Sequence, residues 1–463
     1  MKMITKRGIF LWILSILFVA GIVFLTVSFV QDGDEWAMKR YNKHLYSNGE
    51  LIGAGTIYDS NDIPLAQTIE GKRVYAESKT TRKSTLHIVG DPKNFISSSV
   101  QATYDSRLTG YNVLFGLYNL KRYGKGNDLH LTLDSELCDT AYKALDGRKG
   151  TVGVVNYQTG DIICCVSSPS YDVNDPPYDI DTNDEYEGVY INRLLSAHYV
   201  PGSTFKLVTA ICAIENIPDV YERTWDCNGS YKPEAGGEII CMSDHGENIT
   251  FKDALANSCN SVFAQLAIEL GEEKLNATAK ELGIGTEIKI SGEIGSYAGY
   301  VELDKNIADD TLGWTGIGQG ETKLAPITML RIVSAIANNG SAVSFNIVKN
   351  LSNQAGKLLN LTLPVSKTQL MDESIALKMR EMMRYNVTEV YGDSRFEGLN
   401  LCAKSGTAQT DSNSDHDISW FVGFMDDSSK PYAFVVVVEN SSSGTSVAGP
   451  IANKVLQQVA EKY

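Results

Sequence analysis

A serine and a lysine stand at the start of a long apolar run. Ser203 follows a Pro-Gly pair, and Lys206 lies three residues on, ahead of residues 207–214, which are apolar except for Thr209. The run predicts a buried helix with both side chains on one face of its first turn. Apolar surroundings lower the pKa of an amine, and a neutral amine beside a hydroxyl can act as its general base. The pair predicts a serine nucleophile, although an N-capping serine and a lysine reaching solvent also fit.

Two later segments carry side chains of the same kind. Ser258 and Asn260 are separated by one residue, and Lys404 opens a Lys-Ser-Gly-Thr segment that ends at residue 407. A Ser-x-Asn match is weak evidence alone, since Ser344 opens a second one, whereas Ser-x-x-Lys occurs once in the chain. The three motifs in this order favour an acyl-transfer site over a structural role for the first pair.

With these motifs, the chain from about residue 128 to its end resembles a class B penicillin-binding protein, which is a monofunctional D,D-transpeptidase related to the serine β-lactamases. Nothing in the sequence corresponds to the glycosyltransferase domain that a bifunctional class A enzyme would need. Four further segments carry the resemblance: Leu131-Thr-Leu-Asp134, Ser168-Pro-Ser-Tyr-Asp172, Gly318-Gln-Gly320 and Trp420-Phe-Val-Gly-Phe424.

The resemblance implies a catalytic role for five motif residues. Ser203 would attack the penultimate D-Ala carbonyl of a peptidoglycan stem peptide that ends in D-Ala-D-Ala, while neutral Lys206 takes its proton. Ser258 would relay that proton to the leaving amine. Asn260 would hold the substrate amide and orient Lys206, and Lys404 would supply positive charge for the peptide carboxylate. An amine from a neighbouring stem peptide would then accept the acyl group, which makes a cross-link.

The resemblance also implies how the substrate is held. The hydroxyls of Ser405 and Thr407 would bind the peptide carboxylate, and Gly406 would let the bound chain approach as an added strand. The backbone N–H groups of Ser203 and Thr407 would form the oxyanion hole. A β-lactam antibiotic would mimic D-Ala-D-Ala and leave Ser203 acylated. No cofactor or metal is expected for this reaction.

Three other functions fit parts of the pattern. A D,D-carboxypeptidase would transfer the acyl group to water, and a serine β-lactamase would need a deacylating base. A Glu-x-x-Leu-Asn segment at Glu272 is similar to one that carries such a base, but it also fits an ordinary helix start, and we assign it no role. A non-catalytic scaffold or antibiotic sensor would have no reason to keep all three motifs.

The N-terminus predicts a membrane anchor. Residues 1–7 form a basic head, residues 8–30 contain no charged residue, and acids follow directly. This length spans a bilayer, and the charge distribution favours a cytoplasmic N-terminus with the remainder outside. A cleavable signal peptide is the alternative. We therefore expect a single-pass protein of the bacterial cell membrane, with a pedestal or interaction domain at 31–126 and a transpeptidase domain at 127–463.

Composition limits the other possibilities. The net charge of −15 over 463 residues argues against nucleic-acid binding. The eight cysteines include no Cys-x-x-Cys pair. Cys227 and Cys241 are read as a disulfide, as two free thiols, or as part of a metal site with Asp244 and His245, and these alternatives stay open at this stage.

Strands near both ends of the C-terminal domain, with helices between them, predict an α+β fold. We expect one mixed sheet flanked by helices, together with a small α+β pedestal and one transmembrane helix. The resemblance implies peptidoglycan stem peptides and β-lactams as ligands. It also implies a glycosyltransferase or other cell-wall synthesis proteins as partners.

Overall fold

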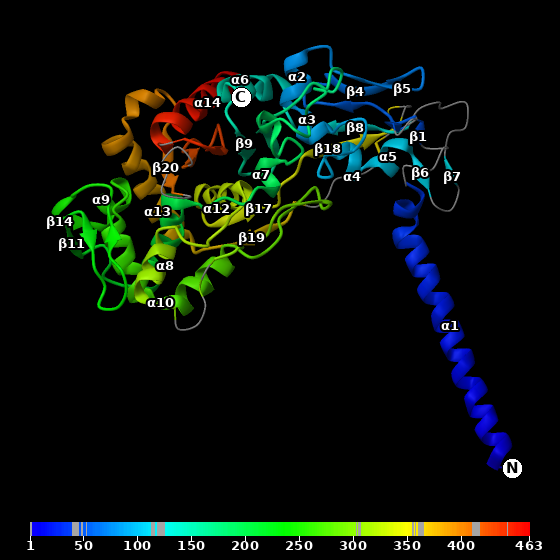
Figure 1. Ribbon diagram of the computed structural model, residues 1–463, viewed down its shortest axis with the longest axis horizontal. Coiled ribbons are helices and arrows are strands. Elements are labelled where there is room, and N and C mark those ends of the chain that lie inside the picture. Colours follow the sequence, from blue (N-terminus) through cyan, green and yellow to red (C-terminus); the bar gives the residue numbers. More distant parts are fainter. Residues whose placement is uncertain are drawn as a thin grey trace.

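The computed structural model describes most of the chain and divides into three parts (Figure 1). Helix α1 (Lys2–Ala37) comes first, an N-terminal α+β part follows, and a larger C-terminal part carries the motifs. The described residues are 2–38, 46–47, 50–51, 53–112, 116–117, 126–301, 303, 307–353, 356, 358–359, 365–409, 417–441 and 443–463.

The C-terminal part is built on a five-stranded sheet with the order β10-β9-β22-β21-β20, and all four ladders are antiparallel. Every residue of β10, β21 and β22 is buried, so both faces of the sheet are covered and the strands read as apolar runs. The prediction that the sheet combines strands from near both ends of the C-terminal domain is confirmed. Its strands are β9 (Gly150–Asn156), β10 (Ile162–Ser168), β20 (Leu401–Ala408), β21 (Ile418–Met425) and β22 (Tyr432–Val438).

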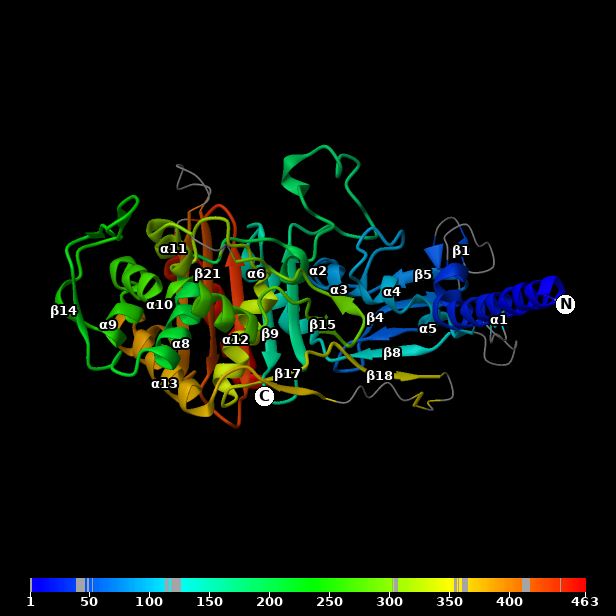
Figure 2. The same ribbon diagram turned by 90° about the horizontal axis from the view of Figure 1, so that it is seen from below.

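Helices cover the two faces of this sheet (Figures 1 and 2). Helices α6 (Ser135–Leu145) and α14 (Gly449–Lys462) pack together on one face, and α12 (Pro326–Ala337) lies on the other. Beyond α12, a group of helices surrounds the motif residues. This group consists of α8 (Lys206–Asn216), α9 (Phe251–Ala256), α10 (Asn260–Glu281), α11 (Asp309–Gly316) and α13 (Glu373–Tyr385).

A second five-stranded sheet, ordered β18-β8-β3-β4-β5, joins the N-terminal part to the rest. The expected domain boundary at residue 127 does not separate the two sheets, because β8 (Asp128–Leu131) and β18 (Val348–Ser352) both lie beyond it. The β3–β8 pair is parallel, so the mixed pairing lies in this sheet. Its N-terminal strands are β3 (Ile57–Tyr58), β4 (Pro64–Ile69) and β5 (Lys72–Tyr75).

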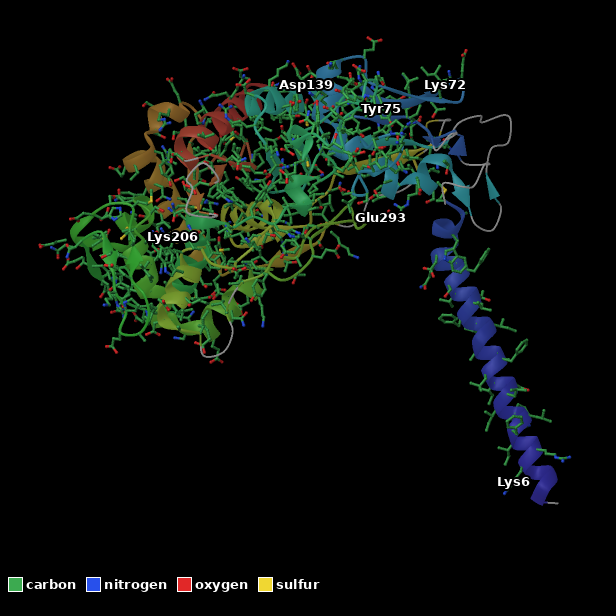
Figure 3. The ribbon with its side chains drawn as sticks, viewed as in Figure 1. Lys6, Lys72, Tyr75, Asp139, Lys206 and Glu293 are labelled. Carbon is green, nitrogen blue, oxygen red and sulfur yellow. The ribbon has the colours of Figure 1, made fainter. Side chains whose placement is uncertain are left out.

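Polar contacts hold the two parts together. Thr81 and Ser84 donate hydrogen bonds of 2.8 and 2.6 Å to the carboxylate of Asp139, which Figure 3 labels on α6. Arg82 makes a two-pronged ion pair with Asp172 at 2.6 and 2.8 Å. The hydrogen bond from Arg82 lowers the pKa of Asp172. The N-terminal part is therefore fixed against the sheet that carries the motifs.

Helix α1 stands apart from the other elements (Figures 1 and 3). Its segment Lys6–Gly33 is long and apolar enough to cross a membrane, and the most apolar stretch of this segment is not buried against any other part of the structure. Figure 3 labels Lys6 at the far end of this helix and Lys206 within the C-terminal part.

Shorter elements complete the described chain. The helices are α2 (Lys79–Ser84), α3 (Leu86–Val89), α4 (Val100–Thr103), α5 (Asp105–Thr109) and α7 (Arg193–Ser196), with shorter turns η1 (Asp184–Tyr186), η2 (Gly202–Phe205), η3 (Asn386–Tyr391), η4 (Asp393–Phe396) and η6 (Gly444–Ala448). The strands are β1 (Tyr46–Ser47), β2 (Glu50–Leu51), β6 (Tyr111–Asn112), β7 (Gly116–Leu117), β11 (Thr224–Cys227), β12 (Ser230–Tyr231), β13 (Ile239–Ile240), β14 (Gly246–Thr250), β15 (Lys289–Ile290), β16 (Ile294–Gly295), β17 (Ser341–Val343) and β19 (Lys367–Gln369).

Candidate active site

Ser203 lies on a short 3₁₀ turn that leads into α8. The sequence predicts a helix that starts at Ser203, whereas the structure has the 3₁₀ turn Gly202–Phe205 first and the α-helix from Lys206. In a 3₁₀ turn, residues three apart stand directly above one another. Lys206 Nζ consequently lies 3.1 Å from Ser203 Oγ, and the Lys206 side chain has no exposed surface.

Two other segments of the chain hold the turn in place. The Trp420 indole donates to the carbonyl of Val200 at 3.0 Å, just before the turn. Gly202 N–H donates to the carbonyl of Gly318 at 2.8 Å. A Cβ on Gly318, whose φ is +78°, would lie 2.1 Å from the Gly202 oxygen, so only glycine fits there. The Trp-Phe-Val-Gly-Phe and Gly-Gln-Gly segments thus position Ser203.

The Ser-x-Asn motif lies on the opposite side of Lys206. Residues 257–259 separate helix α9 from helix α10, and Ser258 adopts a left-handed φ of +57° there. Lys206 Nζ donates to the carbonyl of Ser258 at 2.6 Å and to Asn260 Oδ1 at 2.7 Å, and it lies 3.2 Å from Ser258 Oγ. The break therefore turns both motif side chains toward the lysine.

The Lys-Ser-Gly-Thr motif lies on β20, and its Lys404 side chain reaches the Ser258 hydroxyl. Lys404 is fully buried, and its Nζ lies 3.1 Å from Ser258 Oγ and 2.7 Å from the carbonyl of Ser405. The structure thus brings together all five predicted catalytic residues. The second Ser-x-Asn match lies elsewhere, since Asn346 accepts a hydrogen bond from Ser291 at 2.6 Å.

Burial sets the charge state of the two lysines. It lowers the pKa of Lys206 to about 8, and electrostatic interaction with Cys259 and Cys241 offsets part of this effect. Burial, followed by the charge of Lys206, holds the pKa of Lys404 well below its usual range. Because desolvation disfavours an ammonium group, a neutral amine beside Ser203 is accessible near neutral pH.

The predicted substrate-binding residues run along the edge of the sheet. Strand β20 pairs only with β21 among the described strands, so its other edge faces the Ser203 turn. A Cβ on Gly406 would lie 2.9 Å from the Thr204 methyl, and one on Gly202 would lie 2.6 Å from the Thr407 oxygen. These close approaches require glycine at both positions, and they bring the peptide units of Ser203 and Thr407 near one another.

Tyr391 is a site residue that the sequence analysis missed. Its hydroxyl accepts hydrogen bonds from Ser405 N–H and Ser405 Oγ at 3.0 and 3.1 Å. The side chain is nearly fully buried, and burial raises the pKa of its hydroxyl. Tyr391 ends the π-helical turn η3, outside every motif, so no local sequence signal marks it.

Replacing Tyr391 with phenylalanine is expected to lower the second-order rate of acylation by a fluorescent penicillin about five- to thirtyfold. The variant keeps the ring packing but removes two hydrogen bonds that hold Ser405, each worth about 1 kcal/mol. Stopped-flow or gel-based labelling kinetics measure the effect. Tyr157→Phe, at a buried tyrosine on the β9–β10 turn, is the matched control. Equal rates for both variants would contradict the positioning role.

Four possible metal ligands lie next to the Ser-x-Asn turn. The side chains of Cys227, Cys241, His245 and Cys259 converge, and all the cysteines are free thiols. The disulfide considered for Cys227 and Cys241 is therefore absent from the structure. Asp244, which the sequence placed in the same possible metal set, instead accepts a hydrogen bond from Gly246 N–H at 2.8 Å.

Comparison with known proteins agrees with this geometry. The penicillin binding protein transpeptidase domain family matches residues 150–457. Peptidoglycan D,D-transpeptidase PbpA of Mycolicibacterium smegmatis is 25% identical over 389 residues, which cover 77% of this chain and 78% of the relative. Stage V sporulation protein D of Bacillus subtilis is 28% identical over 72% of this chain and 53% of its own length.

Solved structures show the same fold. The ceftriaxone acyl-enzyme complex of penicillin-binding protein A from M. tuberculosis superimposes with a TM-score of 0.78 at 22% identity, covering 88% of this chain and 98% of that one. The family match covers well over half of the sequence. The chain therefore belongs to the penicillin-binding protein transpeptidase family, and its predicted place among the class B D,D-transpeptidases is confirmed.

Proposed function

We propose that this chain is a membrane-anchored peptidoglycan D,D-transpeptidase in which Ser203 is the nucleophile. One observation carries the assignment of residues. Lys206 Nζ lies 3.1 Å from Ser203 Oγ and 3.2 Å from Ser258 Oγ, while Ser258 Oγ lies 3.1 Å from Lys404 Nζ. A hydroxyl, a base and a proton relay thus form one connected path, in which the two lysines are buried and the two serines are half-buried.

The first half-reaction forms an acyl-enzyme. Neutral Lys206 takes the proton of Ser203 as Oγ attacks the carbonyl of the penultimate D-Ala. When the C–N bond to the terminal D-Ala breaks, Ser258 Oγ passes a proton from Lys206 to the departing amine. Asn260 keeps Lys206 in place through its 2.7 Å hydrogen bond. In the second half-reaction, an amine from a neighbouring stem peptide attacks the ester by the reverse path and releases Ser203.

The edge of β20 is the proposed substrate platform. The donor peptide pairs with this edge as an added strand, which Gly406 permits because it has no side chain. The negative charge of the bound terminal carboxylate offsets the burial that lowers the pKa of Lys404, so Lys404 supplies positive charge when the peptide is bound. The hydroxyls of Ser405 and Thr407 bind the same carboxylate. The N–H groups of Ser203 and Thr407 stabilise the oxyanion, a contact whose loss typically costs a factor of about 10²–10³ in rate. A β-lactam occupies the same place and acylates Ser203.

The rate of β-lactam acylation is expected to rise about tenfold per pH unit up to about pH 8 and to level off above it. Only neutral Lys206 can accept the proton, and its pKa is lowered to about 8 by burial. Labelling rates between about pH 5.5 and pH 9.5 measure this profile. A rate that is flat across this range, or that falls as the pH rises toward 8, would contradict Lys206 as the base.

The transfer reaction itself is tested with a peptide that ends in D-Ala-D-Ala and an added amine acceptor. We expect mass spectrometry to detect the donor joined to the acceptor with release of D-Ala. Enzyme pre-treated with penicillin is the control. Hydrolysis without transfer would instead indicate a D,D-carboxypeptidase, and rapid turnover of the penicillin a β-lactamase.

We also propose the arrangement of the chain at the membrane. Residues 1–7 lie in the cytoplasm, residues 8–30 cross the bilayer, and residues 31–126 hold the transpeptidase part outside. The apolar helix Lys6–Gly33, with basic residues before it and acids after it, supports this orientation. Protease added to intact spheroplasts should degrade the C-terminal part. The N-terminal part is the proposed docking surface for a glycosyltransferase or another cell-wall synthesis protein.

A further inference from the structure

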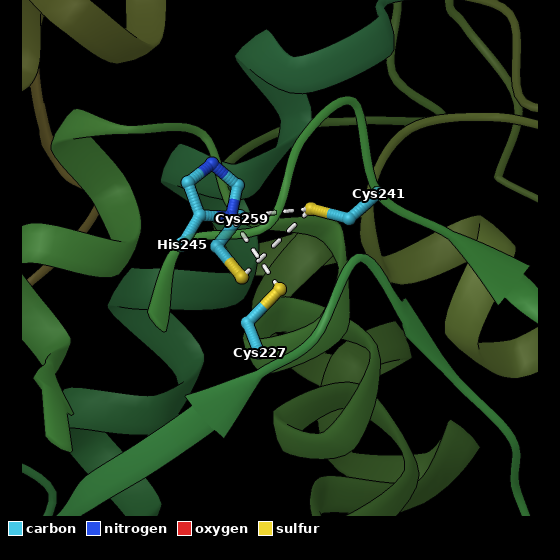
Figure 4. A group of neighbouring side chains, drawn as sticks. All are labelled: Cys227, Cys241, His245 and Cys259. Atoms are coloured by element: carbon cyan, nitrogen blue, oxygen red, sulfur yellow. Dashed lines mark hydrogen bonds between the residues drawn. The ribbon is translucent and has the colours of Figure 1, made fainter. Parts of the chain in front are cut away.

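A set of soft ligands lies beside the Ser-x-Asn turn, outside the residues that perform acyl transfer. Figure 4 shows the side chains of Cys227, Cys241, His245 and Cys259 pointing toward one another. The three Sγ atoms and one ring nitrogen all lie within 4.8 Å of one another. They come from the end of β11, from the loop between β13 and β14, and from the turn before α10. Three segments therefore contribute the four ligands, and the loop between β13 and β14 supplies two of them, Cys241 and His245.

The distances fit ligands around an ion. Around tetrahedral zinc, Zn–S bonds of about 2.3 Å and a Zn–N bond of about 2.0 Å separate two sulfurs by about 3.7 Å and sulfur from nitrogen by about 3.5 Å. Cys241 Sγ lies 3.9 Å from Cys259 Sγ. The Sγ atoms of Cys227 and Cys241 each lie 3.4 Å from His245 Nδ1. A disulfide would need about 2.05 Å between sulfurs, so the group has the spacing of a ligand set.

Neighbouring groups orient these ligands. His245 Nε2 lies 3.2 Å from Ser243 Oγ, and a proton on Nε2 leaves the Nδ1 lone pair free toward the thiols. The N–H of Asn260 donates to Cys241 Sγ at 3.1 Å. Cys227, Cys241 and Cys259 are all buried, and thiolates in such a place are costly without a compensating cation.

We propose that Cys227, Cys241, His245 and Cys259 bind one Zn²⁺ ion that fixes the Ser-x-Asn turn. Three thiolates and one imidazole fill all four positions of tetrahedral zinc, which is the composition of a structural site with no open position for water. Binding releases the protons of those thiols that are still protonated. The site goes beyond the acyl-transfer function, because these residues can hold the ion whether or not the chain cross-links peptides.

The ion would act on the active site through the backbone. Cys259 lies between Ser258 and Asn260, which both contact Lys206. Asn260 Nδ2 also donates to the carbonyl of Ile240 at 2.8 Å, next to Cys241. Strands β12 and β13 have two residues each and bury little surface of their own, so a metal is an effective cross-link for this region. Zinc is thus a positioning element for the Ser-x-Asn turn.

The direct test is the metal content of the full chain, purified in detergent after equilibration with Zn²⁺. We expect one zinc per chain by plasma mass spectrometry, and less than about a fifth of that in Cys227→Ser and His245→Ala. Neither residue belongs to the acyl-transfer machinery. Cys138→Ser, at another buried cysteine on α6, should retain one zinc. Wild-type chain without zinc, or variants that keep it, would overturn the proposal.

A second measurement covers variants that fail to fold. In the wild-type chain, three thiols should be protected from alkylation until a strong chelator is added, and Co²⁺ in place of zinc should give sulfur-to-cobalt charge-transfer absorption. An intramolecular disulfide detected by mass spectrometry would overturn the site. Removing zinc should also slow acylation of Ser203 at least fivefold, with recovery on adding it back, and an unchanged rate would refute the positioning role. Zinc binding without any acylation would instead count against the proposed function alone.

Discussion

Replacing Ser203 with alanine is expected to abolish covalent labelling of the chain by a fluorescent penicillin. In the proposed mechanism this hydroxyl is the atom that becomes acylated, and it lies 3.1 Å from the Lys206 amine that takes its proton. Loss of the nucleophile in a serine acyl-transfer enzyme lowers kcat by a factor on the order of 10⁶. Transpeptidation should therefore fall below detection in the same variant. In-gel fluorescence measures labelling, and product analysis measures transfer.

The chain supplies a matched control for this experiment. Ser344 opens the second Ser-x-Asn match, yet its Oγ accepts a hydrogen bond from Ser366 N–H and takes no part in the site. Ser344→Ala should label at the wild-type rate. If Ser203→Ala labels as strongly as the wild type, another residue is the nucleophile and the proposed mechanism is wrong.

Changing Lys206 to arginine or methionine is expected to lower the acylation rate by a factor of about 10²–10⁴, the usual contribution of a general base. Arginine keeps a positive charge but cannot give up its proton, whereas methionine has a similar length and no amine. Both variants lack a proton acceptor at 3.1 Å from Ser203 Oγ. Labelling kinetics measure the loss, and the pH-dependent rise should disappear in both.

The two substitutions separate catalysis from packing. Lys206 is fully buried and makes hydrogen bonds to Ser258 and Asn260, so either change also affects stability. Thermal unfolding, measured with and without a bound, non-reacting ligand, reports how far each substitution changes the stability of the fold. A folded variant that is acylated at the wild-type rate would show that another group takes the proton.

Much of the site could be predicted because its residues stand in short segments. Ser203 and Lys206 are three residues apart, so local geometry alone places them together. Ser258 and Asn260 are likewise separated by a single residue, so one turn of the chain presents both side chains. The distances between the three motifs depend on the packing of β20 against the Ser203 turn. That the motifs lie close together in space is therefore predicted only by the family resemblance.

Other features were hidden because they depend on long-range contacts. Tyr391 reaches Ser405 from a π-helical turn that has no sequence signature. Cys241 and Cys259 lie 18 residues apart in the chain, and no regular ligand spacing predicts that their sulfurs come within 3.9 Å of each other. The expected boundary at residue 127 marks the start of a clear strand-and-helix pattern. Which strands pair across it is decided by the tertiary fold rather than by that pattern.

The return of β18 to the N-terminal sheet has a consequence for how the protein is made. Strand β3 must wait for β8 to emerge, and β8 then lacks its outer neighbour until residues 348–352 have been synthesised. Domains usually fold in the order in which they leave the ribosome. Here the first part of the chain cannot complete its hydrogen-bond ladder until most of the second part exists. We therefore expect the N-terminal part and the C-terminal part to fold together as one unit.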